Sequence, residues 1–243
     1  MQLSTLARAG TVPVAWTAGC TLIAFVTGSD PMIAVEVIAL ALGAAWLVHV
    51  GRGARRAVTE AARLSAQSQR VDVAGAKVRL LDTTTPAAFV SGLLRPQIYL
   101  TPALIRILDH HELHGVLLHE QHHRRTLAPL RGLALESWQR ALGWLPPARH
   151  ALAKRLAALE IEADAAAVAR GVEPATLASA LVKCGAHLPS SASAFSAASE
   201  IRIGELVAWG RGERVDRHLS IPVEWAAPAS ALMALWVCHL VGA

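Results

Sequence analysis

The chain has 243 residues, of which 53% are hydrophobic and only 17% are charged. This composition is too apolar for an ordinary soluble domain, so membrane spans are the first feature to look for. The formal net charge is +5, but aromatic residues make up only 5% and no nucleic-acid-binding motif is present, so no nucleic-acid partner is expected. The three cysteines are far apart, which argues against a disulfide framework or a thiolate zinc site.

Three apolar segments are long enough to cross a bilayer: residues 9–28, 32–50 and 225–243. The first two are joined by the short turn SDP and predict an N-terminal transmembrane hairpin over residues 1–51. The third predicts a C-terminal transmembrane helix over residues 223–243. Residues 52–222 between them are expected to form a separate domain. Two alternatives exist for the first segment, a cleaved signal peptide or, at TAGC, a loose match to a lipoprotein processing site.

Arginines flank the middle region on both sides. They are Arg52, Arg55, Arg56 and Arg63 after the second apolar segment, and Arg211, Arg214 and Arg217 before the third. Because positively charged residues stay on the cytoplasmic side, this distribution predicts that residues 52–222 face the cytoplasm. The expected location is the cell membrane, with several passes and the lipid bilayer as a partner.

Two short segments of the middle region have the pattern of strands. AKVRLLDT (76–83) alternates apolar and polar residues, and RPQIYL (95–100) begins with a proline suited to a strand start. The stretch TTPAAFVSGL between them is rich in turn residues. The sequence therefore predicts a small β-hairpin or sheet, and RPQIYL is a candidate edge for an extended substrate.

The rest of the middle region predicts helices, because start and stop signals recur along it. Thr101 with Pro102 marks one start, and Asp109 with Glu112 has capping-box spacing before the run 110–125. Further helices are expected from Pro129 to Pro146, from Pro147 to Arg170 with Gly171 as its cap, from Pro174, and over 200–209, with a flexible Ser-rich loop at 189–199. The expected fold class is mainly α with a small β-hairpin or sheet.

His119, Glu120 and His123 form an HExxH pattern on the helix expected over 110–125. Residues four apart lie on one helix face, so both imidazoles can reach one metal ion. Glu120, next to the first histidine, can take a proton from a metal-bound water. The pattern predicts a catalytic Zn²⁺ site with Glu120 as general base.

A catalytic zinc needs a third protein ligand, and the segment ALEIEADAAAV offers one. Glu160 and Asp164 are four apart on the long helix and share a face. Glu160 can bind zinc, and Asp164 can accept a hydrogen bond from the free N–H of a ligand imidazole. Glu162 is expected to be a solvated acid. Glu136 is a rival third ligand without a second acid at helical spacing.

Other polar residues near the motif have simpler interpretations. His122 is rotated away from the ligand pair on the helix, and His110, His111 and His114 are also expected not to bind the metal. Arg124 and Arg125 are expected to face solvent or lipid headgroups.

Three segments, AAFVSGLLRPQIYLTPALI, ELHGVLLHEQHHRR and LEIEADAAAV, together resemble the integral-membrane gluzincin peptidases. The resemblance is greatest to the antirepressor-sensor type of BlaR and MecR and more distant to the HtpX and CAAX-prenyl-protease type. It covers roughly residues 70–170 and the membrane flanks. It implies that His119, His123 and Glu160 bind zinc, that Glu120 is the base and that Asp164 supports a ligand. EIRIGEL resembles a downstream segment of these peptidases, which would place Arg202 near the site.

These observations predict a membrane-embedded, zinc-dependent endopeptidase acting on a protein or peptide, with a regulator among the candidate substrates. His187 or Arg202 could stabilise a developing oxyanion, although no spacing selects either. A non-catalytic membrane receptor or scaffold, and a zinc-dependent sensor with a structural metal, are the alternatives. The substrate and the oligomeric state are not predicted.

Overall fold

The computed structural model describes residues 31–186 and 193–213. The chain divides into two compact units, one made of residues 1–48 with 225–243 and the other running from His49 to Glu224. The sheet and helices α3 to α8 all belong to the second unit. Everything that builds the site therefore comes from that unit.

Helix α2 (Pro31–Ala66) is the first element described and is 36 residues long. It continues past residue 51 because the stretch ARRAVTEAARLSA is rich in alanine, arginine and other strong helix formers. The predicted boundary between residues 51 and 52 therefore falls inside a helix.

In the described part of the chain, no helix is both long and apolar enough to span a bilayer. The predicted span 32–50 lies within α2, and the predicted spans 9–28 and 225–243 lie outside the described residues. The structure thus gives no support to the three predicted transmembrane helices.

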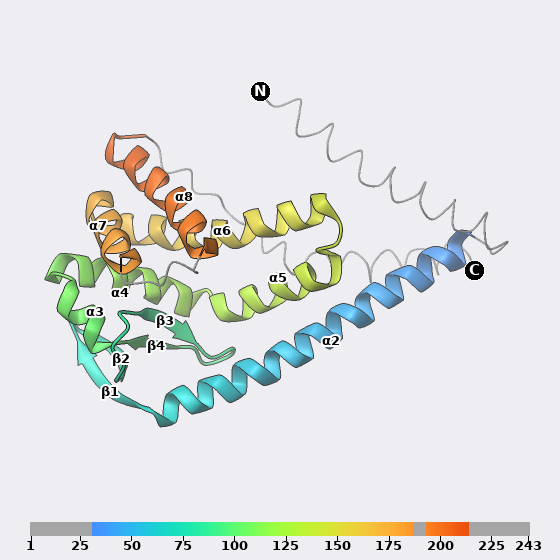
Figure 1. The fold of residues 1–243 in the computed structure, drawn as a ribbon, viewed down its shortest axis with the longest axis horizontal. Helices are drawn as coiled ribbons and strands as arrows, with labels where there is room; N and C mark the ends of the chain where they lie inside the picture. The colour runs from blue at the N-terminus through green and yellow to red at the C-terminus, as the bar shows by residue number, and fades with distance from the viewer. Residues whose placement is uncertain (1–30, 187–192, 214–243) are drawn as a thin grey trace. The chain divides into compact units, whose positions relative to one another are not determined.

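Four strands form one sheet: β1 (Ser68–Val73), β2 (Ala76–Leu81), β3 (Ala88–Ser91) and β4 (Gln97–Leu100). Their order is β1-β2-β4-β3 (Figure 1). β1 and β2 form an antiparallel hairpin whose turn residues, Ala74 and Gly75, both have positive φ (48° and 77°). Such angles suit a tight two-residue turn between twisted strands.

The two predicted strands do not form a hairpin with each other. β2 and β4 pair in parallel, with Arg79 opposite Tyr99, while β3 is the antiparallel partner of β4. Of the two predicted alternatives, a small sheet is confirmed and a hairpin of these two segments is wrong, because the chain between them, expected to be only turn, contains β3. β1 was also missed, since SQRVDV carries too few apolar residues to be distinguished from a loop.

Six helices follow the sheet in the described residues. They are α3 (Pro102–Ile107), α4 (His110–Arg125), α5 (Ala128–Leu142), α6 (Pro146–Val168), α7 (Pro174–Gly185) and α8 (Ser193–Gly210). The helices expected from the proline and capping signals are all present. The expected flexible loop at 189–199 is wrong from Ser193 onward, where α8 begins; alanine-rich sequence favours a helix there despite its serines.

The helix ends confirm several local signals. The side chain of Thr101 accepts a hydrogen bond from the backbone N–H of Leu104, and Asp109 with Glu112 forms a complete capping box at the start of α4. After α6, Gly171 adopts a φ of 91°, which favours glycine, and the N–H of Val172 bonds back to the carbonyl of Ala167. These caps set where α4 begins and where α6 ends, the two helices that carry the site.

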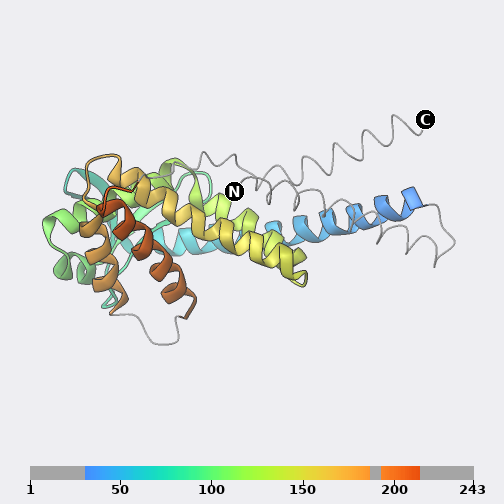
Figure 2. The ribbon, with the colours of Figure 1, turned by 90° about the horizontal axis from the view of Figure 1, so that it is seen from above.

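Two apolar clusters hold these elements together. The first joins the sheet to α3 and α4 through residues such as Ile98, Leu104 and Leu117. The second joins α6, α7 and α8 around Ala167 and Leu206. Figures 1 and 2 both show α6 running antiparallel beside α5. α7 and α8 pack together near the C-terminal end of α6. α4 packs against α6, α7 and β3, so it lies at the centre of this unit.

Candidate metal centre

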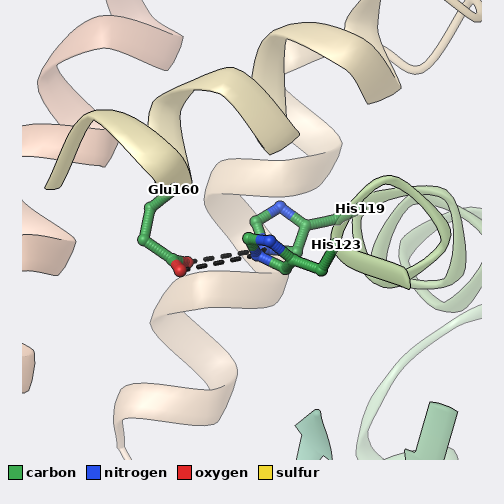
Figure 3. A group of neighbouring side chains, drawn as sticks. All are labelled: His119, His123 and Glu160. Atoms are coloured by element: carbon green, nitrogen blue, oxygen red, sulfur yellow. Dashed lines mark hydrogen bonds and ion pairs between the residues drawn. The ribbon is translucent and has the colours of Figure 1, made fainter. Parts of the chain in front are cut away.

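Three side chains from two helices converge on one point. His119 and His123 project from the same face of α4, and Glu160 points toward them from α6 (Figure 3). The two Nε2 atoms lie 2.9 Å apart, and the Glu160 carboxylate oxygens lie 3.5 Å from His119 Nε2 and 3.4 Å from His123 Nε2. All three ligand atoms fall within 4.8 Å of one another, which is close enough to bind one metal ion.

Asp164 orients the first histidine. Its Oδ1 lies 2.8 Å from Nδ1 of His119, and both side chains are buried. A carboxylate can only accept a hydrogen bond, so the contact assigns the ring proton to Nδ1 and leaves Nε2 free to face the other donors. Asp164 is one helical turn beyond Glu160 on α6, which is why one helix supplies both acids.

Arg202 of α8 contacts both acids. Its Nε donates to Asp164 Oδ2 at 2.7 Å, one terminal nitrogen donates to Asp164 Oδ1 at 2.8 Å, and the other donates to Glu160 Oε2 at 3.2 Å. The contacts to Asp164 form a planar, two-point pairing that arginine makes and lysine does not. Arg202 lies at the site, as the resemblance implied, but its nitrogens already bind carboxylates, which favours a positioning role over oxyanion binding.

The carboxylates around His119 favour positive charge at the site. Burial lowers the pKa of His119, but its hydrogen bonds with Asp164 and Glu160 outweigh burial and raise that pKa to about 9. Burial likewise raises the pKa of Asp164, yet Arg202 and His119 hold it below its ordinary value. Burial raises the pKa of Glu160, but hydrogen bonds and charge interactions with His119 and His123 outweigh burial and lower that pKa. Ionised acids beside two imidazoles form a donor set suited to a divalent cation.

Glu120 lies beside this donor set without belonging to it. It is buried, lines the same cleft and makes no hydrogen bond to the described residues. Burial raises its pKa, although His119 and His123 oppose that shift. A carboxylate with a raised pKa is well suited to accept and return a proton near neutral pH.

The metal centre opens into a cleft of about 830 Å³. Strand β3 and the residues before it, from Pro86 to Val90, form one wall of this cleft. β3 is the edge strand of the sheet, whereas β4 lies between β2 and β3. The expectation that RPQIYL supplies an open edge is therefore wrong, because β3 covers β4.

The remaining candidates lie away from the donor set. Glu136 is exposed and pairs with Arg140 on the same helix, so it is not the third ligand. Glu162 was expected to be solvated, but it is only 15% exposed and pairs with Arg131 and Arg155. That prediction was wrong because helical spacing on α6 does not show that Arg131 of α5 and Arg155 of α6 both reach the Glu162 carboxylate.

The other histidines and arginines near the motif do not join the centre either. Among the described residues, the side chains that could hold a metal ion together are His119, His123 and Glu160. This group includes none of His110, His111, His114 and His122, and the first three of these are exposed. Arg125 is exposed and Arg124 is partly buried. His187 lies outside the described residues.

The sequence profile of Peptidase family M48 matches residues 54–142. A comparison with curated proteins gives no match. The matched segment includes the sheet and the whole of α4, while Glu160, Asp164 and Arg202 lie beyond it. This match and the three convergent side chains support a metal-dependent peptidase. Residues 54–142 are similar to Peptidase family M48.

Proposed function

We propose that this protein is a zinc-dependent endopeptidase that hydrolyses peptide bonds of a protein substrate. The observation that carries the proposal is the convergence of His119, His123 and Glu160 in an open cleft, with buried Glu120 beside them. Two imidazoles and one carboxylate are a frequent ligand set of catalytic zinc, which keeps a further coordination position for water or substrate.

Zinc bound here would polarise the scissile carbonyl and lower the pKa of a bound water. Glu120 accepts the proton that this water loses and later delivers it to the departing amine nitrogen. The apolar surroundings that raise its pKa keep the protonated form accessible, so Glu120 serves as both base and acid. Asp164 holds the His119 ring with Nε2 toward the centre, and Arg202 holds Asp164 and Glu160.

The substrate lies in an extended conformation along β3. This edge strand lines the cleft beside the catalytic residues, and its outer backbone groups are not used by another strand of the described sheet. Main-chain pairing with an edge strand binds a peptide with little regard to its sequence.

The protein acts at the cell membrane as a multi-pass protein of the integral-membrane gluzincin type, with the peptidase unit in the cytoplasm and a regulator among its candidate substrates. The apolar stretches 9–28 and 225–243 and the flanking arginines support this location. Reporter fusions at residue 60 and at residue 213 test the orientation. Activity from a reporter that works only outside the cytoplasm, fused at either position, would contradict this orientation.

Comparison of the wild-type chain with Glu120→Gln tests the catalytic assignment. The variant keeps the metal ligands, so we expect it to bind zinc normally while cleaving no protein, measured by metal analysis and by mass spectrometry of new N-termini in cells. Glu136→Gln is the matched control, because Glu136 is an exposed acid on α5 outside the cleft. A chelator removes the wild-type activity, and added zinc restores it. Equal cleavage by wild type and Glu120→Gln refutes the proposed function.

A further inference from the structure

The cleft has almost no charge outside the metal centre. Among the described residues that line it, the ionisable side chains are His119, Glu120, His123, Glu160, Arg202 and the thiol of Cys184. The first five belong to the site, and burial raises the pKa of Cys184, which keeps its thiol neutral. A charged substrate side chain placed elsewhere in the cleft would find no charged partner among these residues, and burying an unpaired charge is costly.

Small residues of α5 and α6 form one part of the cleft wall. Ala128 and Gly132 lie four apart on α5, and Ala153 and Ala157 lie four apart on α6. Residues four apart share a helix face, so each pair presents a smooth strip to the cleft. The packing of α5 against α6 brings the two strips together, and we call this region the α5–α6 bay.

Gly132 gives this bay its depth. A Cβ atom built on Gly132 meets no atom within 4 Å, so packing among the neighbouring atoms does not require a glycine there. Glycine inside a helix is about 1 kcal/mol less favourable than alanine. Its φ is not positive either, so no special backbone angle requires it. The space that Gly132 leaves is open to whatever enters the cleft.

A second observation points to a ligand in this cleft. Glu120 is only 7% exposed, lines the cleft and has no hydrogen-bond partner among the described residues. The bay and the buried acid thus open into the same space. An occupant of the bay therefore lies in the same cleft as Glu120.

We infer that the substrates are peptide segments with a large uncharged side chain, such as Leu, Met or Phe, seated in the α5–α6 bay next to the cleaved bond. The inference rests on the proposed function and specifies its substrate class. Apolar contact supplies the selectivity: a large side chain fills the bay, and a small one leaves it empty. Lys, Arg, Asp and Glu are excluded at that position.

The experiment uses the full chain in detergent with zinc and a peptide mixture made by digesting a proteome. Mass spectrometry identifies every cut that Glu120→Gln does not produce. We expect a large uncharged residue on one side of these cuts. Two synthetic peptides that differ only in Leu or Ala at that position then give kcat/KM values, with the Leu peptide preferred about tenfold or more.

Gly132→Leu fills the bay and is expected to bring kcat/KM for the Leu peptide down to the value for the Ala peptide, which removes the preference. Gly132→Ala should give an intermediate preference, and its small change keeps the test valid if the leucine variant folds poorly. Gly204→Leu is the matched control, because Gly204 also lies in a helix with open space at its Cβ but outside the cleft. Thermal unfolding and zinc content check that each variant is intact.

The outcomes separate the two proposals. Glu120-dependent cuts that accept charged residues as readily as apolar ones overturn the inference and leave the proposed function standing. So does a Gly132→Ala variant that loses both synthetic peptides in equal proportion. If no cut depends on Glu120, the proposed function fails, and the inference fails with it.

Discussion

Nδ1 of His119 lies 2.8 Å from Oδ1 of Asp164, and this contact joins α4 to α6 across 45 positions of the chain. Both side chains are buried, so the contact is shielded from water and from competing donors. It aligns a ring on one helix with an acid on another, and the same second helix carries Glu160, the third candidate ligand. The geometry of the centre therefore depends on how these two helices pack.

Asp164→Asn tests this contact. The amide keeps the size of the side chain but loses the negative charge that holds the Nδ1 proton, so His119 is oriented less firmly and is a weaker base. We expect zinc affinity to fall roughly 10- to 100-fold, as is usual when a partner of a metal-bound histidine is changed. Competition with a fluorescent zinc chelator measures the affinity. Glu136→Gln should bind zinc like the wild type, and an unchanged affinity in Asp164→Asn would show that the contact is dispensable.

Arg202→Gln should change the pH dependence of activity. Burial raises the pKa of Asp164, and the guanidinium of Arg202 is the main group that lowers it again. Without Arg202 the pKa of Asp164 rises, so Asp164 becomes protonated at a higher pH and releases the His119 ring there. The acid limb of the profile of kcat/KM against pH is expected to move to higher pH.

Arg202→Lys should recover only part of the wild-type profile, because an ammonium group lacks the planar two-point pairing. An acid limb that stays in place in Arg202→Gln would contradict the positioning role. A change in KM alone would instead indicate contact with the substrate.

Glu112 links the stability of the second unit to pH. Burial raises the pKa of Glu112, but hydrogen bonds from Lys183, Ser179 and the backbone of Asp109 outweigh it and lower the pKa below its ordinary value. In the unfolded chain the pKa of a glutamate is about 4.3. Because the pKa of Glu112 is lower in the folded protein, its ionised form stabilises the fold at pH values above the unfolded pKa. That stabilisation is lost as the pH falls through the pKa of Glu112 in the folded protein.

The free energy of unfolding of wild type and Glu112→Gln measures this effect. We expect the wild type to be more stable above about pH 5, with a difference that shrinks as the pH falls below the unfolded value. The comparison isolates Glu112 because all other acids are the same in both proteins. A difference that stays constant down to acid pH would show that the charge of Glu112 contributes nothing.

Gly171→Ala should destabilise the fold. Gly171 has a φ of 91°, which an alanine side chain resists, so the substitution is expected to cost on the order of 1 kcal/mol. Gly204→Ala is the contrasting variant: Gly204 lies in a helix with open space at its Cβ, and alanine should stabilise it by about 0.5–1 kcal/mol. Thermal unfolding measures both. Equal shifts in the same direction would refute the conformational explanation.

Local patterns predicted most of the helices and the two histidines that α4 presents on one face. The capping box at Asp109 and Glu112, the glycine at 171 and the four-residue spacing of His119 and His123 depend on neighbours along one helix. The spacing of Glu160 and Asp164 is equally local. Such features follow from helix geometry alone, so they can be read without knowing how the helices pack.

Contacts between distant segments decided the rest. The parallel pairing of β2 with β4, the pairing of Glu162 with Arg131, and the three contacts of Arg202 all join residues from different elements. Spacing along the chain made Glu160 a better candidate than Glu136, but only the packing of α6 against α4 brings its carboxylate to the two imidazoles. The sequence by itself determined which side chains each helix presents on one face. Which faces meet depends on apolar burial summed over the whole unit, and that is a property of the tertiary structure.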